Sequence, residues 1–508
     1  NSELMKALSI AVTGSKEDAL LAVKDISDDV LDYKMRDILL KITGGRIEHA
    51  ILSLKKIREE DKNKSSIEAA FIEAGLLKKH GKPDESIDVL KYLKEITKSS
   101  EEKFIVLLEL GATEIQIGKI SDAKEHFEEA VQISPENSLV WANLGQAYYR
   151  LGNTKDAITC LETSLTIENN NGQALSNLFS IYQYSVGENE KIRELINKMI
   201  VNPTTRDLGY FAQSLMDLQS KKFRKGFKKF ESRFQCFKNT YKEKEKHIIS
   251  QLKHAKNIND IKGKKVLVIS EQGAGDEIMF SRFIPLLNQY TSKTAYLPSG
   301  PVLPIMQEAL KEVEISGEFV QQDYDAFIYV MSIPYLLGYK MEENIPLPEL
   351  HVNKNLINSF HQLVTSAGKH KKKIGITWSG TSKNFHDCVR SIPIEKFEDL
   401  FNLKHDFFLI NNEIKPEEIA FASKFANIHN FCEKISTFED TAALMKNMDI
   451  IISVDTASIH LAGTMNIPSY LLIPKFIDWR WFNNQKNTEW YPSVELIRLT
   501  SSDSDWSE

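Results

Sequence analysis

The sequence has few cysteines, no long apolar run and no large charge excess, and each of these shortages excludes a class of protein. The four cysteines, Cys160, Cys236, Cys388 and Cys432, lie far apart, which predicts neither a disulfide framework nor a zinc site. No apolar run approaches the ~20 residues of a membrane span, and a net charge of −6 gives no polyanion-binding character. The chain starts at Asn1 instead of Met, which is compatible with a removed upstream segment, and no signal peptide is recognisable. We therefore expect a cytoplasmic protein without a membrane span.

What the first 200 residues do contain is one amphipathic helical pattern after another. Two sets of residues within them are related by a spacing of 34. The first set is Leu107, Leu110, Gly111, Glu114, Gly118, Ala123, Phe127 and Ala130, and the second is Trp141, Leu144, Gly145, Tyr148, Gly152, Ala157, Leu161 and Ser164. This period resembles the tetratricopeptide repeat (TPR). We predict an all-α TPR superhelix over residues 1–200, with degenerate or capping repeats at its start. Such arrays usually present a concave surface to a protein or peptide.

Residues 201–261 are predicted to form a helical junction. Phe223, Phe227, Phe230 and Phe234 recur on one face, which indicates packing against the neighbouring domain. The alternating lysines and glutamates at 242–246 indicate a solvated helix or a linker.

From residue 262 the pattern changes to alternating strands and helices. Predicted strands are 265–270, 294–297, 326–329, 374–378, 407–410, 450–452 and 470–473, and predicted helices are 277–290, 416–425, 437–446 and 456–462. The basic run at 369–373 has no interleaved aromatic residues, so we interpret it as a linker and not as a nucleic-acid site. Two Rossmann-like domains, 262–368 and 369–508, are therefore predicted, with a cleft between their strand ends.

The segment 449–468 reads as strand, polar turn, helix and strand. Asp455 and Thr456 fall at the helix start, where free N–H groups and the helix dipole favour a phosphate. Thr456 and His460 are four residues apart and share one helix face. These residues alone leave open a simpler interpretation, in which Asp455 only caps the helix and His460 is packed in the core.

A glycine-rich turn follows the first strand of the α/β region. Gly273 and Gly275 allow close approach of the backbone to a ligand, and Asp276 falls at a helix start. The glycine spacing matches neither the dinucleotide-binding fingerprint nor the P-loop. A carboxylate here can accept a proton from an attacking hydroxyl, or it can serve only as a helix cap.

Four aromatic residues, Trp479, Trp481, Trp490 and Tyr491, follow the last predicted strand. A sugar or a base can stack on such rings, and packing between the last helix and the cleft floor is the alternative.

Three motifs occur in order: EQGAGDEIMFSRFIPLL at 271–287, WSGTSKNFHDCVRSIPIEKF at 378–397, and DTAALMKNMDIIISVDTASIHLAGTMNIPSYLLIPKFIDWRW at 440–481. Together they resemble bacterial TPR proteins with a fused GT-B glycosyltransferase module, similar to the lipopolysaccharide heptosyltransferases. Some members of this group look like flagellin glycosyltransferases that use a nonulosonic acid donor. The resemblance implies a TPR superhelix followed by the two Rossmann-like domains of a GT-B fold.

The resemblance also implies roles for individual residues. Asp276, after Gly275, corresponds to the general base proposed for such enzymes. The residues that correspond to donor-binding positions are Asp455, Thr456 and His460 at the phosphates, Trp378, Ser379 and Gly380 along the cleft, and Arg390 and Ser391 at phosphate or sugar. Two departures matter: Ala274 stands where the family carries a bulkier residue, and heptosyltransferases lack the repeats, so their lipid acceptor is not carried over.

We therefore expect a glycosyltransferase that moves a sugar from a nucleotide-sugar donor to a serine or threonine of a protein acceptor bound by the repeats. No DxD-like site is evident, so neither a metal nor a cofactor is expected, and no nucleic-acid partner is predicted. The alternative is a non-catalytic TPR adaptor that carries a degenerate transferase module.

Overall fold

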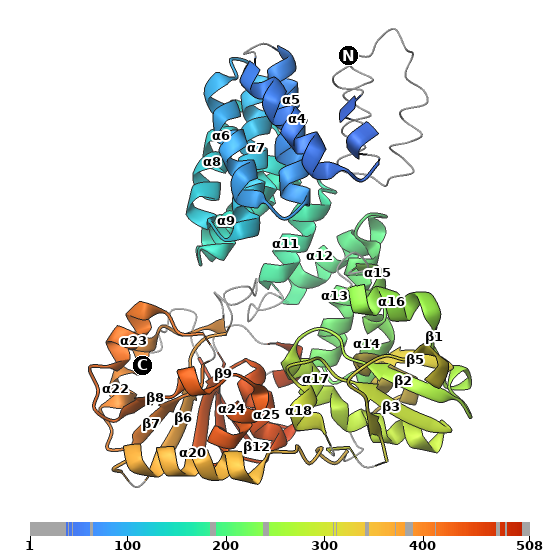
Figure 1. The fold of residues 1–508 in the computed structure, drawn as a ribbon, viewed down its shortest axis with the longest axis vertical. Coiled ribbons are helices and arrows are strands. Elements are labelled where there is room, and N and C mark those ends of the chain that lie inside the picture. The colour runs from blue at the N-terminus through green and yellow to red at the C-terminus, as the bar shows by residue number, and fades with distance from the viewer. Residues whose placement is uncertain are drawn as a thin grey trace. The chain divides into compact units, whose positions relative to one another are not determined.

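The protein is described from a computed structural model (Figure 1). The described residues are 37–38, 40–42, 44–60, 64–182, 189–236, 243–307, 309–310, 312–340, 345–370, 372–380, 390–411, 413–473, 478–482 and 485–499. Most of the predicted capping repeat at the start of the chain, and Cys388, lie outside them. The chain divides into two compact units, 1–178 and 179–508.

The first unit consists of helices that pack in sequential pairs (Figure 1). They are α4 (Ile47–Glu60), α5 (Lys64–Lys79), α6 (Pro83–Ile96), α7 (Ser100–Ile117), α8 (Ile120–Ile133), α9 (Ser138–Arg150), α10 (Thr154–Ile167) and α11 (Gly172–Tyr182), whose end passes into the second unit. The pairs α7–α8 and α9–α10 are the two segments related by 34 residues.

Small residues explain why these pairs pack closely. A Cβ on Gly111 would stand 2.5 Å from Phe127 Cε1, and one on Gly145 would stand 2.7 Å from Leu161 Cγ, so only glycine fits at either crossing. The turn glycine that follows the first helix of each pair, Gly118 or Gly152, has a left-handed φ of 86° or 82°. The predicted repeat is therefore confirmed in its packing as well as in its period.

The second unit begins with α12 (Asn189–Val201), which was predicted as part of the repeat array, and continues with the helices of the predicted junction. The junction helices are α13 (Arg206–Gln219), α14 (Phe223–Phe230), α15 (Arg233–Cys236) and α16 (Glu243–Gln251). Phe223 and Phe227 of α14 are 3% and 1% exposed. Phe227 contacts both Phe280 and Trp479, with ring centroids 6.1 Å away in each case. The predicted role of this aromatic face as core is confirmed.

The first sheet has five parallel strands in the order β1-β5-β2-β3-β4. The strands are β1 (Lys253–His254), β2 (Lys265–Ile269), β3 (Lys293–Leu297), β4 (Glu314–Ile315) and β5 (Ala326–Tyr329). The helices of this half are α17 (Ala274–Phe280), the 3-10 helix η4 (Ser281–Gln289), α18 (Leu303–Met306) and α19 (Ile333–Leu337). The central strand β2 pairs Leu267 with Phe327 of β5.

The second sheet has the order β11-β12-β10-β9-β6-β7-β8, and only β11 is antiparallel to its neighbour. The strands are β6 (Lys373–Thr377), β7 (Asp406–Leu409), β8 (Ile428–Asn430), β9 (Ile450–Val454), β10 (Ser469–Ile473), β11 (Asn487–Thr488) and β12 (Tyr491–Arg498). Its helices are α20 (Lys354–Ala367), α22 (Glu398–Phe401), α23 (Pro416–Ala422), α24 (Phe438–Met445), α25 (Ala457–Thr464) and the 3-10 helix η9 (Trp479–Trp481). The predicted fold class, a TPR-like helical region followed by two Rossmann-like parallel sheets as in a GT-B fold, is confirmed.

Besides α12, two elements lie on a different side of the predicted domain boundaries from the one expected. Strand β1, inside the predicted junction 201–261, pairs with β5 of the first sheet. Helix α20, inside the predicted domain 262–368, packs against α24 of the second half. The predicted helix 277–290 is also divided, because Pro285 has no N–H for an α-helical bond and the chain continues as the 3-10 helix η4. The other boundaries stay predictions.

Candidate functional site

The candidate site lies where the chain reverses its direction of travel across each sheet. In the first sheet the chain runs from β2 outward to β3 and β4, then returns to β5 on the other side of β2. In the second it runs from β6 to β7 and β8, then returns to β9 on the other side of β6. The carboxyl ends of strands at such points form the ligand crevices of open α/β sheets. The sequence motifs follow three of these strands: β2, β6 and β9.

Asp276 is held at the first of these points by two contacts. Its Oδ2 accepts a hydrogen bond from the Gly273 amide at 3.3 Å, and its Oδ1 forms a salt bridge with Arg480 Nη2. The side chain is 18% exposed, so part of it remains accessible. Gln272, four residues before Asp276, has φ = 58°. This left-handed conformation is uncommon for a residue with a side chain and is often found at functional turns.

Glu271 supports the turn and is not free to act as a base. Its two oxygens accept bonds from Arg233 Nε and Nη2, both at 2.8 Å, and Oε1 also accepts from the Met331 amide. Arg233 is 2% exposed. Its burial opposes the positive charge, but the Glu271 and Glu231 carboxylates outweigh burial and raise the Arg233 pKa. The network fixes the glycine-rich turn to the junction helices.

Arg480, in η9, is the cation that faces Asp276 from the second half. Asp478 Oδ1 accepts bonds from its Nη1 at 2.8 Å and from its backbone amide at 2.9 Å. The guanidinium carbon lies 4.6 Å from the centre of the Trp479 ring. Burial opposes the charge, but Asp276 and Asp478 outweigh it and raise the Arg480 pKa. A permanent positive charge therefore stands between the two halves.

The start of α25 is not capped by the side chain of its own N-cap residue. Thr456 is the N-cap residue, and its side chain makes no capping bond; its Oγ1 lies 3.4 Å from Ser453 Oγ. Asp455 precedes the cap, so the open alternative in which Asp455 itself caps the helix is wrong. Burial, followed by the nearby Asp478 charge, raises the Asp455 pKa to about 6, against the opposing effect of Arg390 and Arg480.

His460 is packed, as the simpler interpretation anticipated. It is 5% exposed, stacks on Trp481 with centroids 5.2 Å apart, and shares a 3.0 Å hydrogen bond between Nδ1 and the Tyr491 hydroxyl. Burial lowers its pKa well below the usual value, with smaller contributions from the Arg480 and Arg282 charges, so the ring is neutral near pH 7. Its Nε2 lies 3.9 Å from Asp455 Oδ1. The predicted contact of His460 with donor phosphates stays a prediction.

The two sequence motifs meet directly at Gly275. A Cβ at this position would lie 2.8 Å from His460 Cδ2, inside any real contact distance. Helix α17 therefore packs against α25 through a glycine backbone and an imidazole. Because of this contact, Asp276 and the α25 start belong to one site.

Of the donor-binding residues predicted in the second motif, only some lie near the start of α25. Arg390 Nη1 donates to the Asp455 carbonyl at 3.1 Å, and Ser391 Oγ accepts from the Gly380 amide at 3.3 Å. The Ser379 hydroxyl accepts from Asn411 Nδ2 at 2.9 Å. Trp378 is 0% exposed, and its Nε1 donates to Glu418 at 2.9 Å, so its indole lies in the core and does not line a cleft.

The late aromatic cluster is core. Trp479, Trp481, Trp490 and Tyr491 are all 5% exposed or less. Of the two alternatives left open by the sequence, packing is therefore the one observed.

Sequence reasoning missed the charged partners of the site, Arg480 and Asp478. A signal was present, since Arg480 stands directly between two tryptophans. A charge between large apolar side chains needs a buried partner, but nothing in the sequence identifies the distant Asp276 as one.

Three general features concern the described residues only. No group of three or more His, Cys, Asp or Glu side chains there is placed to hold a metal ion. None of the helices in the described ranges is long and apolar enough to cross a membrane. Cys160, Cys236 and Cys432 are free thiols.

The fold and the site define a protein with a helical repeat unit and two α/β halves that meet at the Asp276–Arg480 salt bridge and at the packing of α17 on α25. A tetratricopeptide repeat family model matches residues 115–178, so this segment is a TPR. Protein FlbA of Caulobacter vibrioides is 23% identical over 264 residues, which are 47% of this chain and 44% of FlbA. The chain thus spans less than half of that relative's length.

Solved structures are similar to each part of the chain. The E. coli ADP-heptose lps heptosyltransferase II is 13% identical and aligns over 47% of this chain and 92% of that one, with a TM-score of 0.34. MamA is 19% identical over 40% of this chain and 98% of that one, with a TM-score of 0.27.

Proposed function

We propose that this protein is a metal-independent glycosyltransferase of the GT-B type that transfers a sugar from a nucleotide-sugar donor to a serine or threonine of a protein. One observation carries the proposal: the carboxyl ends of both sheets converge on Asp276, Arg480 and the uncapped start of α25. A carboxylate, a fixed cation and free amides at one crevice suit the transfer of a group away from a phosphate.

The donor phosphates would be held on the second half. The amides at the start of α25 and the Thr456 hydroxyl offer hydrogen bonds, and Arg390 adds a positive charge beside Asp455. The loop after β6 would adjoin the donor with Ser379 and Gly380, and Ser391 is hydrogen-bonded to Gly380. Because His460 is neutral, it orients the site through hydrogen bonding and contributes no charge.

The reaction would be a single displacement. The acceptor oxygen attacks the anomeric carbon and forms the new C–O bond, while the bond from that carbon to the phosphate oxygen breaks and its electron pair stays on the phosphate. Asp276 takes the acceptor proton. Arg480 and the α25 amides stabilise the negative charge that develops on the leaving group.

The acceptor would be recognised by the TPR unit, since such repeats bind polypeptides. The resemblance to flagellin glycosyltransferases extends the proposal to flagellin as acceptor, with a nonulosonic acid as the sugar, in the cytoplasm. The chemistry at Asp276 requires neither flagellin as the acceptor nor a nonulosonic acid as the sugar.

Two measurements test the proposal. Purified protein should consume a nucleotide-sugar donor in the presence of its acceptor, and intact-mass analysis of flagellin from cells with and without this protein should differ by one or more sugar masses. Donor binding without turnover of any donor–acceptor pair would instead favour the non-catalytic adaptor.

A further inference from the structure

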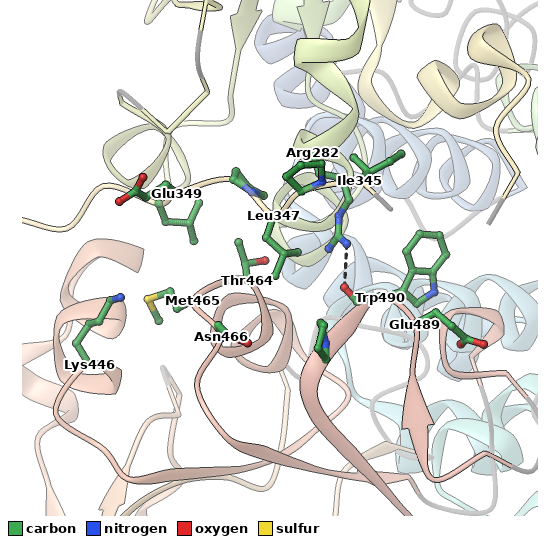
Figure 2. Close-up of a pocket in the computed structure, with 14 residues that line it drawn as sticks. Arg282, Ile345, Leu347, Glu349, Lys446, Thr464, Met465, Asn466, Glu489 and Trp490 are labelled. Atoms are coloured by element: carbon green, nitrogen blue, oxygen red, sulfur yellow. Dashed lines mark hydrogen bonds between the residues drawn. The ribbon is translucent and has the colours of Figure 1, made fainter. Parts of the chain in front are cut away.

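A pocket of the larger unit lies at the far end of α25 from the candidate site. It has a volume of about 440 Å³ and is lined by the first half, by the second half and by residues 345–350, the linker that precedes α20. The side chains that determine its chemistry are Arg282, Leu347, Glu349, Lys446, Met465 and Trp490 (Figure 2). No residue proposed for donor binding or catalysis lines it.

Arg282 is a buried cation without an anionic partner among the described residues. It is 6% exposed, and its Nε and Nη1 donate to two neutral carbonyls, those of Met279 and Trp490, each at 2.8 Å. Its Nη2 has no hydrogen-bond partner in the described part of the chain. Figure 2 shows the side chain reaching between Leu347 and Trp490, with the bond to the Trp490 carbonyl drawn. A guanidinium in this state is a strong site for an oxyanion.

The other charges around the pocket leave this role open. Glu489 forms a salt bridge with Lys221 and is therefore committed elsewhere. Glu349 and Lys446 are exposed and of opposite sign. The rest of the wall combines apolar side chains, such as Leu347 and Met465, with the polar Thr464 and Asn466. The buried Arg282 charge thus has apolar surface beside it along Leu347 and Met465.

We propose that this pocket binds a small amphipathic anion, with a carboxylate or phosphate monoester group at Arg282 and a short apolar body along Leu347 and Met465. Because both halves and the linker form the wall, the ligand binds only one arrangement of the halves. The Arg282 guanidinium also lies 4.9 Å from the Tyr491 ring centre, and the Tyr491 hydroxyl is bonded to His460. A ligand bound at Arg282 would therefore be linked to the candidate site through Tyr491 and His460. Its binding does not depend on the proposed activity.

The test uses the full chain and three probes: octanoate, octyl phosphate and the uncharged 1-octanol. Calorimetry should detect one or both anions, and their relative affinity identifies the head group. Hydrogen exchange should show protection of residues 345–350 and 464–466. Arg282→Gln should weaken binding by about 10- to 100-fold, the usual effect of losing a charged hydrogen bond.

Two further variants keep the result interpretable if Arg282→Gln folds poorly. Leu347→Trp narrows the pocket from the linker while leaving Arg282 itself unchanged and should also abolish binding, whereas Arg390→Ala, at the donor side, should leave binding unchanged. The proposal is overturned if neither anion binds, if octanol binds as tightly as the anions, or if binding persists in Leu347→Trp. Protection at the start of α25 in place of the linker would also overturn it.

Discussion

Asp276 and Arg480 stand 204 residues apart in the sequence and form a salt bridge at the site. Arg480 has two carboxylate partners, Asp276 and Asp478, and only Asp276 lies at the glycine-rich turn. This arrangement gives Asp276 two separable roles, as a proton acceptor and as a partner that positions Arg480. Substitutions at the two aspartates separate them.

Asp276→Asn should lower the transfer rate by roughly 10²–10⁴-fold, the usual loss of a general base. It should also lower stability, by about 1–3 kcal/mol, because Arg480 loses one of two charged partners. Asp478→Asn removes the other partner and is the matched control. It should cost similar stability with a much smaller rate loss, measured as transfer rate and Tm on the same preparations. Equal rate losses in both variants would reduce Asp276 to a positioning residue.

The raised pKa of Asp455 makes stability depend on pH in a defined direction. With a pKa of about 6 in the folded protein, against a lower ordinary value, the folded state keeps a proton that the unfolded chain has lost. The unfolding free energy should therefore fall as pH rises from about 4 to about 6, by about 1–3 kcal/mol, and then stay level.

Asp455→Asn imitates the protonated form and should remove this component. The quantity to measure is the difference in unfolding free energy between wild type and variant across that pH range, from denaturant titrations. A difference that stays constant with pH would show that Asp455 titrates normally.

At the residue level the sequence predicted which positions gather at the strand ends better than it predicted which way they point. Asp276, Thr456 and Arg390 follow strands, and parallel strands bring such positions together by topology alone. Trp378 also follows a strand, but its indole turned into the core, because side-chain direction depends on packing that the motif does not encode. The Asp276–Arg480 pair could not be predicted from the sequence, since no periodicity relates residues so far apart.

At the scale of elements, the packing of α17 on α25 depends on Gly275. Gly275→Ala would place a methyl group 2.8 Å from His460 Cδ2, and that ring is held by Trp481 and Tyr491, so the helices must separate. We expect a loss of about 1–3 kcal/mol in stability together with a strong loss of transfer.

Gly273→Ala is the control on the same turn. A methyl group there meets only Asp276 Oδ2, at 3.6 Å, and the backbone φ of −97° suits alanine. This variant should keep a near-normal melting curve and most of its activity. If Gly275→Ala behaved in the same way, the close contact with His460 would not be needed.

Elements were predictable where the apolar pattern was long enough. The strand at 326–329 was predicted with the bounds it has as β5, and β9 and β10 within two residues at either end. The two-residue strands β1, β4 and β11 carry no periodicity and could not be seen. Strand β12 was missed because Pro492 lies near its start, and proline argues against a strand except at an edge or an end.

At the scale of the whole molecule, the chain should divide functionally between its two compact units. A fragment of residues 179–508 keeps α12, which packs on α13, and α13, which packs on α14. It should bind the donor with nearly unchanged affinity by calorimetry, yet fail to modify a protein acceptor by intact mass. A fragment that begins at residue 201 loses α12 and is a poorer choice. Full protein modification by the 179–508 fragment would remove the TPR unit from acceptor recognition.

The salt bridge between Asp276 and Arg480 also bears on timing. While the two side chains are paired, Asp276 Oδ2 accepts a bond from the Gly273 amide, and Oδ1, the oxygen that would take the proton, is occupied by the guanidinium. A donor phosphate that draws Arg480 toward itself releases this oxygen, so the base becomes available only after the donor has arrived. The expected consequence is a compulsory order of binding, donor before acceptor, with little attack by water on a donor that has not yet displaced the pair. Initial rates at varied concentrations of both substrates would reveal that order, and random addition would show that the pair does not control it.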